Sequence, residues 1–187
     1  MLEVMVAMAL TGLLMLCAQQ LLAAAARYYR HSQASMELQQ SLLAGCSRVS
    51  VEVGESNYGS IVVDAGPPAG IIFITPRRFD GKTSIVNGKA QWFRMVAFYS
   101  EMVKGEPCLV WKERGIPPTS VPPYPAVGAP WDKISTWQGF AQPPKIIARR
   151  ITNFTVTDTT PLLLQMTAAD PSGRYEFMVE SRVHPKN

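Results

Sequence analysis

A long apolar run near the amino terminus constrains this chain more than any other feature of its sequence. The run extends from Val4 to Ala26. Its only breaks in apolar character are Thr11, Gly12, Gln19 and Gln20. The length matches the roughly 20 residues that an α-helix needs to cross the hydrocarbon core of a bilayer. We therefore expect a transmembrane helix in residues 1–26 and one globular domain in residues 27–187.

Glu3 is the only charged side chain in the first 26 residues. An ionised carboxylate beside the apolar phase is costly unless it reaches the interface or a cationic partner, so such residues usually mark a function. The candidate partners are the chain's own amino terminus and the amino terminus of a neighbouring copy, packed helix against helix. The alternative is a carboxylate that lies in the headgroup layer.

The residues after the apolar run, Arg27, Tyr28, Tyr29 and Arg30, have the composition of a membrane interface. Applied to this chain alone, the positive-inside rule places both arginines, and the domain that follows them, in the cytoplasm. A cleaved secretory signal is a further alternative, because Ala23–Ala26 contains the small-residue pattern of a cleavage site. The acidic residue ahead of the run and the length of the run both argue against that alternative.

The helix is expected to continue well beyond the apolar run. No proline occurs before Pro67, and apolar residues recur at steps of three and four along one face. These residues are Leu38, Leu42, Cys46, Val49 and Val53. Gly54 is a suitable terminus. The prediction is one helix from near Leu2 to near Val53, apolar all round at first and amphipathic in residues 27–53.

Beyond this helix the periodicity changes to that of strands, with segments rich in β-branched and aromatic residues. The candidate strands are Ser60–Val63, Ile71–Thr75, Trp92–Tyr99 and Cys108–Glu113. Gly, Pro, Asn and Asp mark the turns, including Asn87-Gly88 and Lys104-Gly105. Near the carboxyl terminus, Leu162–Thr167 is expected to form a hairpin with an alternating strand that ends at Val183.

An amphipathic helix and a sheet with one apolar face can cover each other, so the predicted fold class is α+β, with the helix packed on an antiparallel sheet. The proline-rich stretch from Ile116 to Pro130 is predicted to be a long loop rather than a central strand. Pro122 and Pro125 form a P-x-x-P pattern there, which we interpret as part of a surface insertion. Trp131 and Trp137 either hold this loop against the domain or, if exposed, form a contact surface.

The chain has three cysteines, and only Cys46 and Cys108 could pair. A disulfide between them would tie the helix to the sheet. Two separately buried thiols explain the same residues equally well. Cys17 lies inside the apolar run, where we expect it to pack as a small apolar residue.

Catalytic and metal-binding patterns are not recognisable in this sequence, so we expect neither enzymatic activity nor a cofactor. His31 and His184 are the only histidines, and neither has catalytic partners nearby in the sequence. The net charge of +4 could attract nucleic acid or an anionic membrane surface. However, Arg77-Arg78 and Arg149-Arg150 are isolated pairs, whereas nucleic-acid binders usually show a concentrated basic patch.

The segment Leu2-Glu3-Val4-Met5-Val6-Ala7-Met8-Ala9-Leu10, followed by Thr11-Gly12-Leu13-Leu14, closely resembles the start of type IV pilins and of type II secretion pseudopilins. In that family, prepilin peptidase removes a basic leader ending in glycine before an aromatic residue, at the prepilin cleavage and methylation motif. Neither leader nor aromatic residue precedes Glu3, so we expect this chain to be shortened at its start. A restored leader would reverse the positive-inside prediction, and the family orientation is the one we adopt.

Ala148–Val156, the hairpin after it and the terminal segment Arg182–Asn187 resemble W-type minor pilins and J-type minor pseudopilins. The resemblance implies a structural subunit at or near a filament tip that primes assembly of a type IV pilus or a type II secretion pseudopilus. Its partners would be other pilins or pseudopilins and the inner membrane, with the carboxyl-terminal domain outside the cytoplasm and later in a periplasmic or cell-surface filament. Contacts between subunits would use Glu3, Leu2, Val4, Val6 and Leu10.

A second hypothesis belongs to another functional class. The chain could be a membrane-anchored extracytoplasmic protein that binds DNA or a surface ligand. Trp131, Trp137 and scattered basic residues would then form the binding surface. Salt-sensitive DNA binding is the property that would separate this hypothesis from a purely structural subunit.

Overall fold

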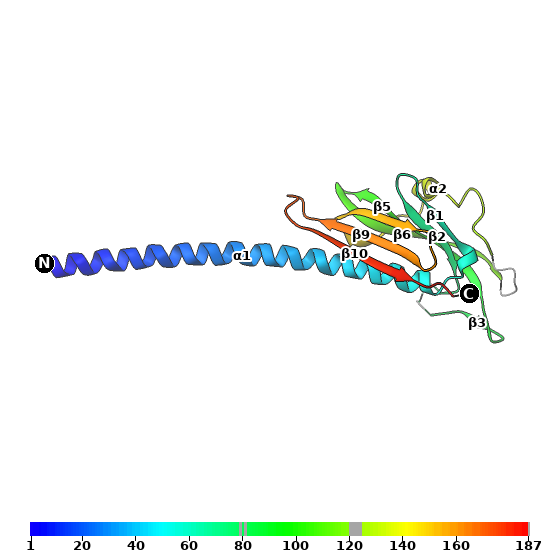
Figure 1. Cartoon of the computed structure of the whole chain (residues 1–187), viewed down its shortest axis with the longest axis horizontal. Coiled ribbons are helices and arrows are strands. Elements are labelled where there is room, and N and C mark those ends of the chain that lie inside the picture. The colour runs from blue at the N-terminus through cyan, green and yellow to red at the C-terminus, as the bar shows by residue number, and fades with distance from the viewer. Residues whose placement is uncertain (79, 81, 120–124, 187) are drawn as a thin grey trace. The chain divides into compact units, whose positions relative to one another are not determined.

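The first element of the chain is a single long helix. The computed structural model describes residues 1–78, 80, 82–119 and 125–186. Helix α1 extends from Leu2 to Gly54, so the predicted helix and its terminus are confirmed. The chain divides into two units, Met1–Glu37 and Leu38–Asn187, which we call the N-terminal unit and the compact unit (Figure 1). The N-terminal unit consists of helix alone, and each unit is described by itself.

The remainder of the compact unit is mainly antiparallel sheet, and the fold class is α+β. After a 3₁₀ turn at Tyr58–Ser60 come the strands and one short helix, in the order β1 (Ile61–Asp64), β2 (Gly70–Thr75), β3 (Ile85–Val86), β4 (Lys89–Ala90), β5 (Trp92–Val103), β6 (Glu106–Thr119), α2 (Ile134–Gly139), β7 (Lys145–Arg149), β8 (Ile151–Thr157), β9 (Leu162–Ala169) and β10 (Glu176–Val183). One sheet has the order β1-β2-β5-β6-β7, a second has the order β10-β9-β8, and β3 pairs with β4.

The strands predicted from the sequence are confirmed. The predicted turns of two hairpins, β3–β4 and β5–β6, are confirmed as well. Asn87 and Gly88 have φ values of 52° and 72°, and Lys104 and Gly105 have 52° and 83°. Two consecutive residues with positive φ are typical of the tight hairpin turn whose twist matches that of the strands. The β9–β10 hairpin also forms, with Leu162 opposite Val183.

The prediction that the proline-rich stretch is entirely loop is wrong at its beginning. Strand β6 continues through Pro117 and Pro118 to Thr119. Strand β7 pairs with β6 only between Cys108 and Trp111. No described strand pairs with β6 on that side beyond Trp111, so a proline without an N–H group interrupts no ladder on that edge. Pro122 of the P-x-x-P pattern lies outside the described residues.

The second half of α1 packs against the sheets and contributes one side of the main core of the compact unit. Its buried stripe contains Leu38, Leu42, Cys46, Val49 and Val53, as predicted. These side chains pack in one cluster with residues of both larger sheets, among them Phe98 and Met166. Gly45 allows a close approach, because a Cβ atom there would lie 2.9 Å from the Ala148 Cβ. The amphipathic part of the helix and the sheets therefore cover each other's apolar faces.

The opposite face of the five-stranded sheet has a second core beneath α2. Ile72, Tyr99 and Val110 contribute from the strands, and Ile134 and Trp137 contribute from α2. Gly70 leaves the space that α2 needs, because a Cβ atom there would lie 2.6 Å from both the Ile134 Cδ1 and the Phe98 carbonyl oxygen. The central strands β2 and β5 are consequently buried on both faces.

Candidate functional site: an exposed apolar helix with one carboxylate

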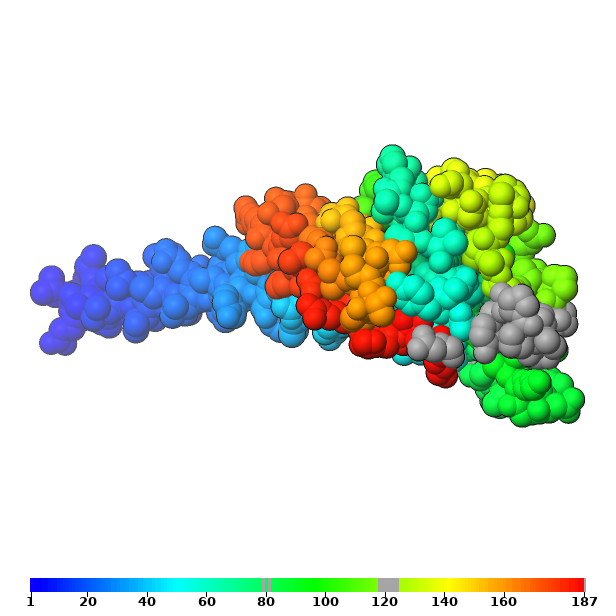
Figure 2. All heavy atoms as spheres, turned by 45° about the vertical axis from the view of Figure 1, so that its right-hand side comes forward, coloured from blue at the N-terminus to red at the C-terminus, as the bar shows by residue number. Residues whose placement is uncertain are grey.

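The N-terminal unit exposes an apolar surface along its helix as far as Ala26. Every residue from 1 to 31 is exposed. Leu2 is 79% exposed and Leu10 is 58% exposed, and the space-filling view shows these first turns (blue) with nothing from their own unit to cover them (Figure 2). Burying one such side chain is worth about 1.5–3 kcal/mol, so water is an unfavourable solvent for this segment. By length and composition, α1 is the one helix among the described residues that could cross a membrane.

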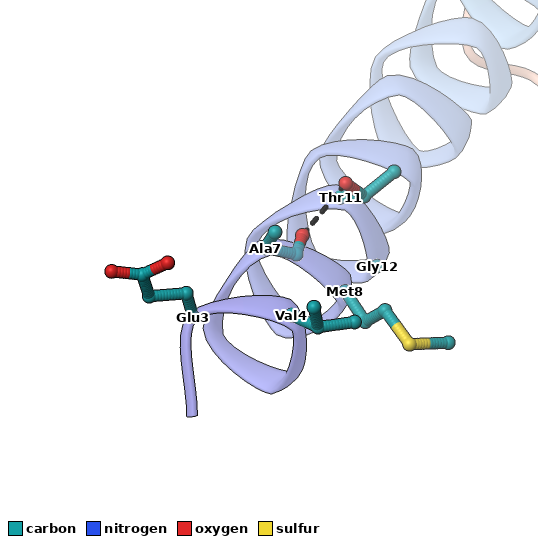
Figure 3. A pocket seen from close by; sticks show the side chains of 6 residues that line it. All are labelled: Glu3, Val4, Ala7, Met8, Thr11 and Gly12. Atoms are coloured by element: carbon teal, nitrogen blue, oxygen red, sulfur yellow. Dashed lines mark hydrogen bonds between the residues drawn. The ribbon is translucent and has the colours of Figure 1, made fainter. Parts of the chain in front are cut away.

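The Glu3 carboxylate lies in the first turn of α1 and projects away from the helix (Figure 3). An acid in this position interacts favourably with the positive end of the helix dipole. No ion pair between described residues includes Glu3. The carboxylate is therefore accessible to a cation supplied by another molecule.

Two different helix faces meet at Glu3. At 100° per residue, Val6 and Leu10 lie within about 60° of Glu3 around the helix, and Leu2 lies beyond Val6, about 100° from Glu3. A shallow groove begins on the other side of Glu3 and is lined by Val4, Ala7, Met8, Thr11 and Gly12. The Thr11 hydroxyl donates a hydrogen bond of 2.8 Å to the Ala7 carbonyl oxygen, so it brings no unpaired polar group to an apolar contact (Figure 3). Bulky side chains and a groove with small residues thus flank the carboxylate.

The four residues predicted to lie at a membrane interface are all exposed. Arg27, Tyr28, Tyr29 and Arg30 follow one another on α1. Consecutive helical residues point in directions about 100° apart, so the four side chains surround the helix. This arrangement suits a belt at the headgroup layer.

A buried charge network fixes the second half of α1 to the sheet, and the sequence did not indicate it. The Arg94 guanidinium lies between two buried carboxylates, 2.9 Å from Glu52 Oε2 and 2.8 Å from Glu113 Oε2. Glu52 also pairs with Arg48 at 2.8 Å, and Glu113 pairs with Lys145 at 2.6 Å. The usable signal was the alternation within the strands, which directs Arg94 and Glu113 to the same face as Val96 and Trp111.

The Trp111 ring is part of the same region. The guanidinium carbon of Arg48 lies 4.6 Å from the ring centroid, and the Lys145 ammonium lies 5.2 Å from it. Arg94 lies 5.5 Å from the centroid. Cations over an aromatic face are attracted by its quadrupole, so Trp111 helps to hold these side chains in place.

The two cysteines that could have paired are both free and buried. Cys46 belongs to the core beneath α1, whereas Cys108 belongs to the core on the opposite face of the sheet. Adjacent residues of a strand point to opposite faces, and it is Leu109, not Cys108, that faces the helix. The structure therefore has the two separately buried thiols of the alternative interpretation. Burial raises the pKa of Cys108, which keeps this thiol protonated near neutral pH.

Helix α2 is held at both ends by charged side chains. Asp64 Oδ2 accepts a hydrogen bond of 2.9 Å from the Ile134 N–H at its start. The buried Lys112 ammonium donates to the carbonyl oxygens of Trp137, Gln138 and Phe140, at 2.8 to 3.1 Å, at its end. Both charges have the sign that the helix dipole favours.

The indoles of Trp131 and Trp137 hold the loop against the domain. Trp137 is fully buried, and its Nε1–H donates to the Trp131 carbonyl oxygen at 2.9 Å. Trp131 packs edge-on against Trp137 and carries the Arg114 guanidinium at 4.1 Å from its ring. These residues do not form the exposed aromatic surface that the binding-protein hypothesis would use.

The basic pairs predicted as isolated take part in local ion pairs. Arg77 approaches Glu55 at 3.6 Å, and Arg149 pairs with Glu106 at 3.0 Å. Within the described part of the chain, no group of three or more His, Cys, Asp and Glu side chains could hold a metal ion.

No family model, curated protein or solved structure matches this chain.

Proposed function

We propose that this protein is a structural minor subunit of a type IV pilus or a type II secretion pseudopilus, placed at or near the filament tip and priming assembly. The observation that carries the proposal is the N-terminal unit, an exposed apolar helix with one carboxylate in its first turn. The same helix continues into the core of a folded domain. A subunit that is stored in a bilayer and later bundled with other subunits needs both features.

The membrane would serve as the storage site for the subunit. The apolar run to Ala26 is long enough to cross the hydrocarbon core, and Arg27 to Arg30 would lie among the headgroups. The compact unit would then be outside the cytoplasm, in the orientation that the family resemblance implies. Anchoring requires no partner protein, so the subunit can wait as a folded monomer.

Assembly would replace lipid contacts with contacts between helices. An apolar helix gains little hydrophobic energy by leaving lipid for another apolar helix, so close packing and polar pairs must supply the specificity. The groove beside Glu3, with Ala7 and Gly12, would allow close approach of a neighbouring helix. Glu3 would pair with the amino terminus of that neighbour. Opposite charges about 4 Å apart attract by roughly 4 kcal/mol at an effective dielectric of 20, before desolvation, which is enough to favour one register.

The compact unit would act as a rigid head that does not change during assembly. Its core is complete without a second copy, and the Glu52–Arg94–Glu113 network ties the helix to the sheet inside it. The chemistry of the proposed function is therefore confined to the first turns of α1. No bond is made or broken, and the protein acts by binding alone.

The test is a pair of matched carboxylate substitutions on exposed positions of α1. We expect Glu3→Gln and Glu3→Ala to reduce incorporation into filaments by at least tenfold, while membrane anchoring and folding of the compact unit are retained. Glu37→Gln removes an exposed helical carboxylate outside the apolar run and should have no effect. Incorporation can be measured by quantifying the subunit in sheared filaments against the subunit in membranes. Normal incorporation of Glu3→Ala would reject the proposed mechanism.

The structure gives the binding-protein hypothesis no exposed aromatic surface at these tryptophans, because Trp137 is buried and the Arg114 guanidinium lies over the Trp131 ring. The hypothesis retains a clear test. Salt-sensitive binding of duplex DNA by the full-length chain in detergent would favour it over the structural role.

A further inference from the structure

Three turns and the beginning of the covered part of α1 meet at one end of the compact unit. The Ser41 hydroxyl accepts a hydrogen bond of 2.9 Å from the Arg149 N–H, which places the β7–β8 junction beside α1. Glu106 brings the β5–β6 turn to the same place, with its carboxylate 3.0 Å from Arg149. The Ala169 N–H donates to the Arg150 carbonyl oxygen at 3.2 Å, which adds the β9–β10 turn. Figure 1 shows both hairpin turns at this end.

This end carries exposed positive charge. We call Lys104, Arg149, Arg150 and Arg174 the basic rim. Glu106 is shared by Arg149 and Arg150, so one carboxylate faces two guanidinium groups. Lys104 and Arg174 are exposed and belong to no ion pair between described residues.

The acidic side chains at this end do not cancel the basic rim. Asp170 uses its carboxylate inside the β9–β10 turn, where it accepts from the Ser172 hydroxyl and, at 2.9 Å, from the Tyr175 N–H. Those hydrogen bonds, with the Ser172 hydroxyl first, lower the pKa of Asp170. Glu176 is the remaining exposed carboxylate beside this turn. Met102, the second residue before the β5–β6 turn, adds an apolar side chain that is 64% exposed.

Only a short connection along the chain joins the apolar run to the compact unit. Only residues 27–37 separate Ala26 from the first residue of the compact unit. At a helical rise of 1.5 Å per residue this connection spans roughly 17 Å. Strand β5 alone is longer, because 12 residues of strand span about 40 Å. Leu38, where the compact unit begins, is therefore separated from Ala26 by a short length of chain, and Ser41 of the rim end follows it three residues later.

We propose that the basic rim binds the anionic headgroup surface of the membrane, in a step that rests on the proposed anchoring by α1. Lysine and arginine side chains near a surface of anionic lipid are attracted to it, and the attraction falls off within a Debye length. Met102 suits the boundary between headgroups and acyl chains. Contact with the rim would hold the compact unit against the bilayer until the subunit is extracted.

The opposite end of β5 supplies a matched control. Lys89 is the first residue of β4, directly after the Asn87-Gly88 turn, which like the Lys104-Gly105 turn has two consecutive residues with positive φ. Ile85 in that hairpin is 65% exposed, against 64% for Met102. Ser41, close to the start of the compact unit, lies at the rim end, and each end presents an exposed apolar side chain and a lysine at or beside its hairpin turn.

The experiment places a fluorescent label at either end of the full-length chain. Met102→Cys and Ile85→Cys are made in a Cys17→Ala background, because Cys17 is exposed whereas Cys46 and Cys108 are buried. Each labelled protein is reconstituted in vesicles of phosphatidylcholine, with or without phosphatidylglycerol, that contain a headgroup nitroxide quencher. Resistance to carbonate extraction is measured on the same vesicles and reports anchoring independently.

We expect strong quenching of the label at position 102 in vesicles with phosphatidylglycerol and weak quenching at position 85. Lys104→Gln or Arg174→Gln should each lower the contact population at position 102 by roughly fivefold, the factor for one basic residue at such a surface. Glu176→Gln should raise it, and Lys89→Gln should leave it unchanged. Equal quenching at both positions, or quenching at 102 that is insensitive to phosphatidylglycerol and to the rim charges, would overturn the inference. Extraction by carbonate would instead reject the proposed anchoring.

Discussion

The two halves of α1 show how one helix can be built for two surroundings. Residues 2–31 are exposed on every face, and their side chains are apolar on every face to Ala26. Leu38 to Val53 instead bury one stripe against the sheets and leave polar residues elsewhere. A helix that is apolar all round has no stable place in water, whereas an amphipathic helix needs only one apolar surface to cover it. The change of pattern therefore marks where the exposed apolar half gives way to the half that the protein's own core covers.

Polar contacts differ between the halves in the same way. In the covered half, Glu52 is paired with Arg94 and Arg48 inside the compact unit. In the exposed half, Glu3 takes part in no ion pair between described residues. One carboxylate secures the fold, and the other remains available to another molecule.

The largest effect is expected from removing the charge that holds the covered half. Arg94→Met leaves Glu52 and Glu113 as buried carboxylates that have lost their shared partner, which typically costs about 3–5 kcal/mol. The free energy of unfolding of the compact unit, measured with urea on the full-length chain in detergent, should fall by this amount. Arg174→Met is the exposed control and should change it by less than about 0.5 kcal/mol. Equal stability of the Arg94 and Arg174 variants would show that the network does not secure the helix.

The next effect compares two adjacent leucines of the covered half. Leu42 is 1% exposed and Leu43 is 57% exposed. Leu42→Ala leaves a cavity in the core and should lower the free energy of unfolding by about 2–5 kcal/mol. Leu43→Ala should leave it nearly unchanged in the same urea titration. A larger loss from Leu43 would mean that the stripe facing the sheets is misassigned.

A smaller change in the free energy of unfolding is expected from replacing a glycine in the covered half of α1, with a glycine in the exposed half as the control. At Gly45 a Cβ atom would meet the Ala148 Cβ at 2.9 Å, whereas at Gly12 it would meet nothing within 4 Å. Gly45→Ala should destabilise the compact unit by about 1–2 kcal/mol, since the steric cost exceeds the gain in helix propensity. Gly12→Ala should leave urea unfolding unchanged and slightly raise the helix content measured by circular dichroism. If Gly45→Ala instead raised the free energy of unfolding, α1 would have to lie further from β7 than the structure has it.

The smallest effect is a pH dependence that belongs to the compact unit alone. The Ser172 hydroxyl and then the Tyr175 N–H lower the pKa of Asp170 below its ordinary value of 3.8. Its stabilising contribution is therefore complete above that value and is lost as the pH falls through the lower, folded-state pKa. Asp170→Asn should unfold with a weaker dependence on pH in this acidic range. An identical pH profile for the two proteins would contradict the assignment.

Local patterns were sufficient to predict most elements of the fold. The apolar run, the helical periodicity after it and Gly54 predicted the extent of α1, and strand-type segments with turn residues predicted β2, β5 and the β9–β10 hairpin. Such signals work because neighbouring residues determine them. Helix α2 was missed, since its six residues are too few to show a period, and their partners Asp64 and Lys112 are distant in the sequence.

Long-range features could not be predicted in this way. Whether Cys46 meets Cys108 depends on which face of β6 the helix covers, and strand register sets that choice. The Glu52–Arg94–Glu113 network joins residues of three elements. Within each element alone, the sequence shows only a charged residue near apolar ones. The sequence predicts a loop at Pro117, because it does not show where β7 stops pairing with β6. The strand can contain this proline only because that pairing ends before it. In the candidate site, the sequence indicated Glu3 and its neighbours, and the structure added their exposure.

The central claim is that the apolar half of α1 stays attached to the folded unit and lies in the bilayer. The most direct test is the intact mass of the protein purified from its native membranes, compared with that of any soluble form. We expect a membrane-bound chain that retains the apolar run through Ala26. A soluble chain that begins at Arg27 would contradict this account, because the helix would then be a cleaved signal and Glu3 would have no part in the mature protein.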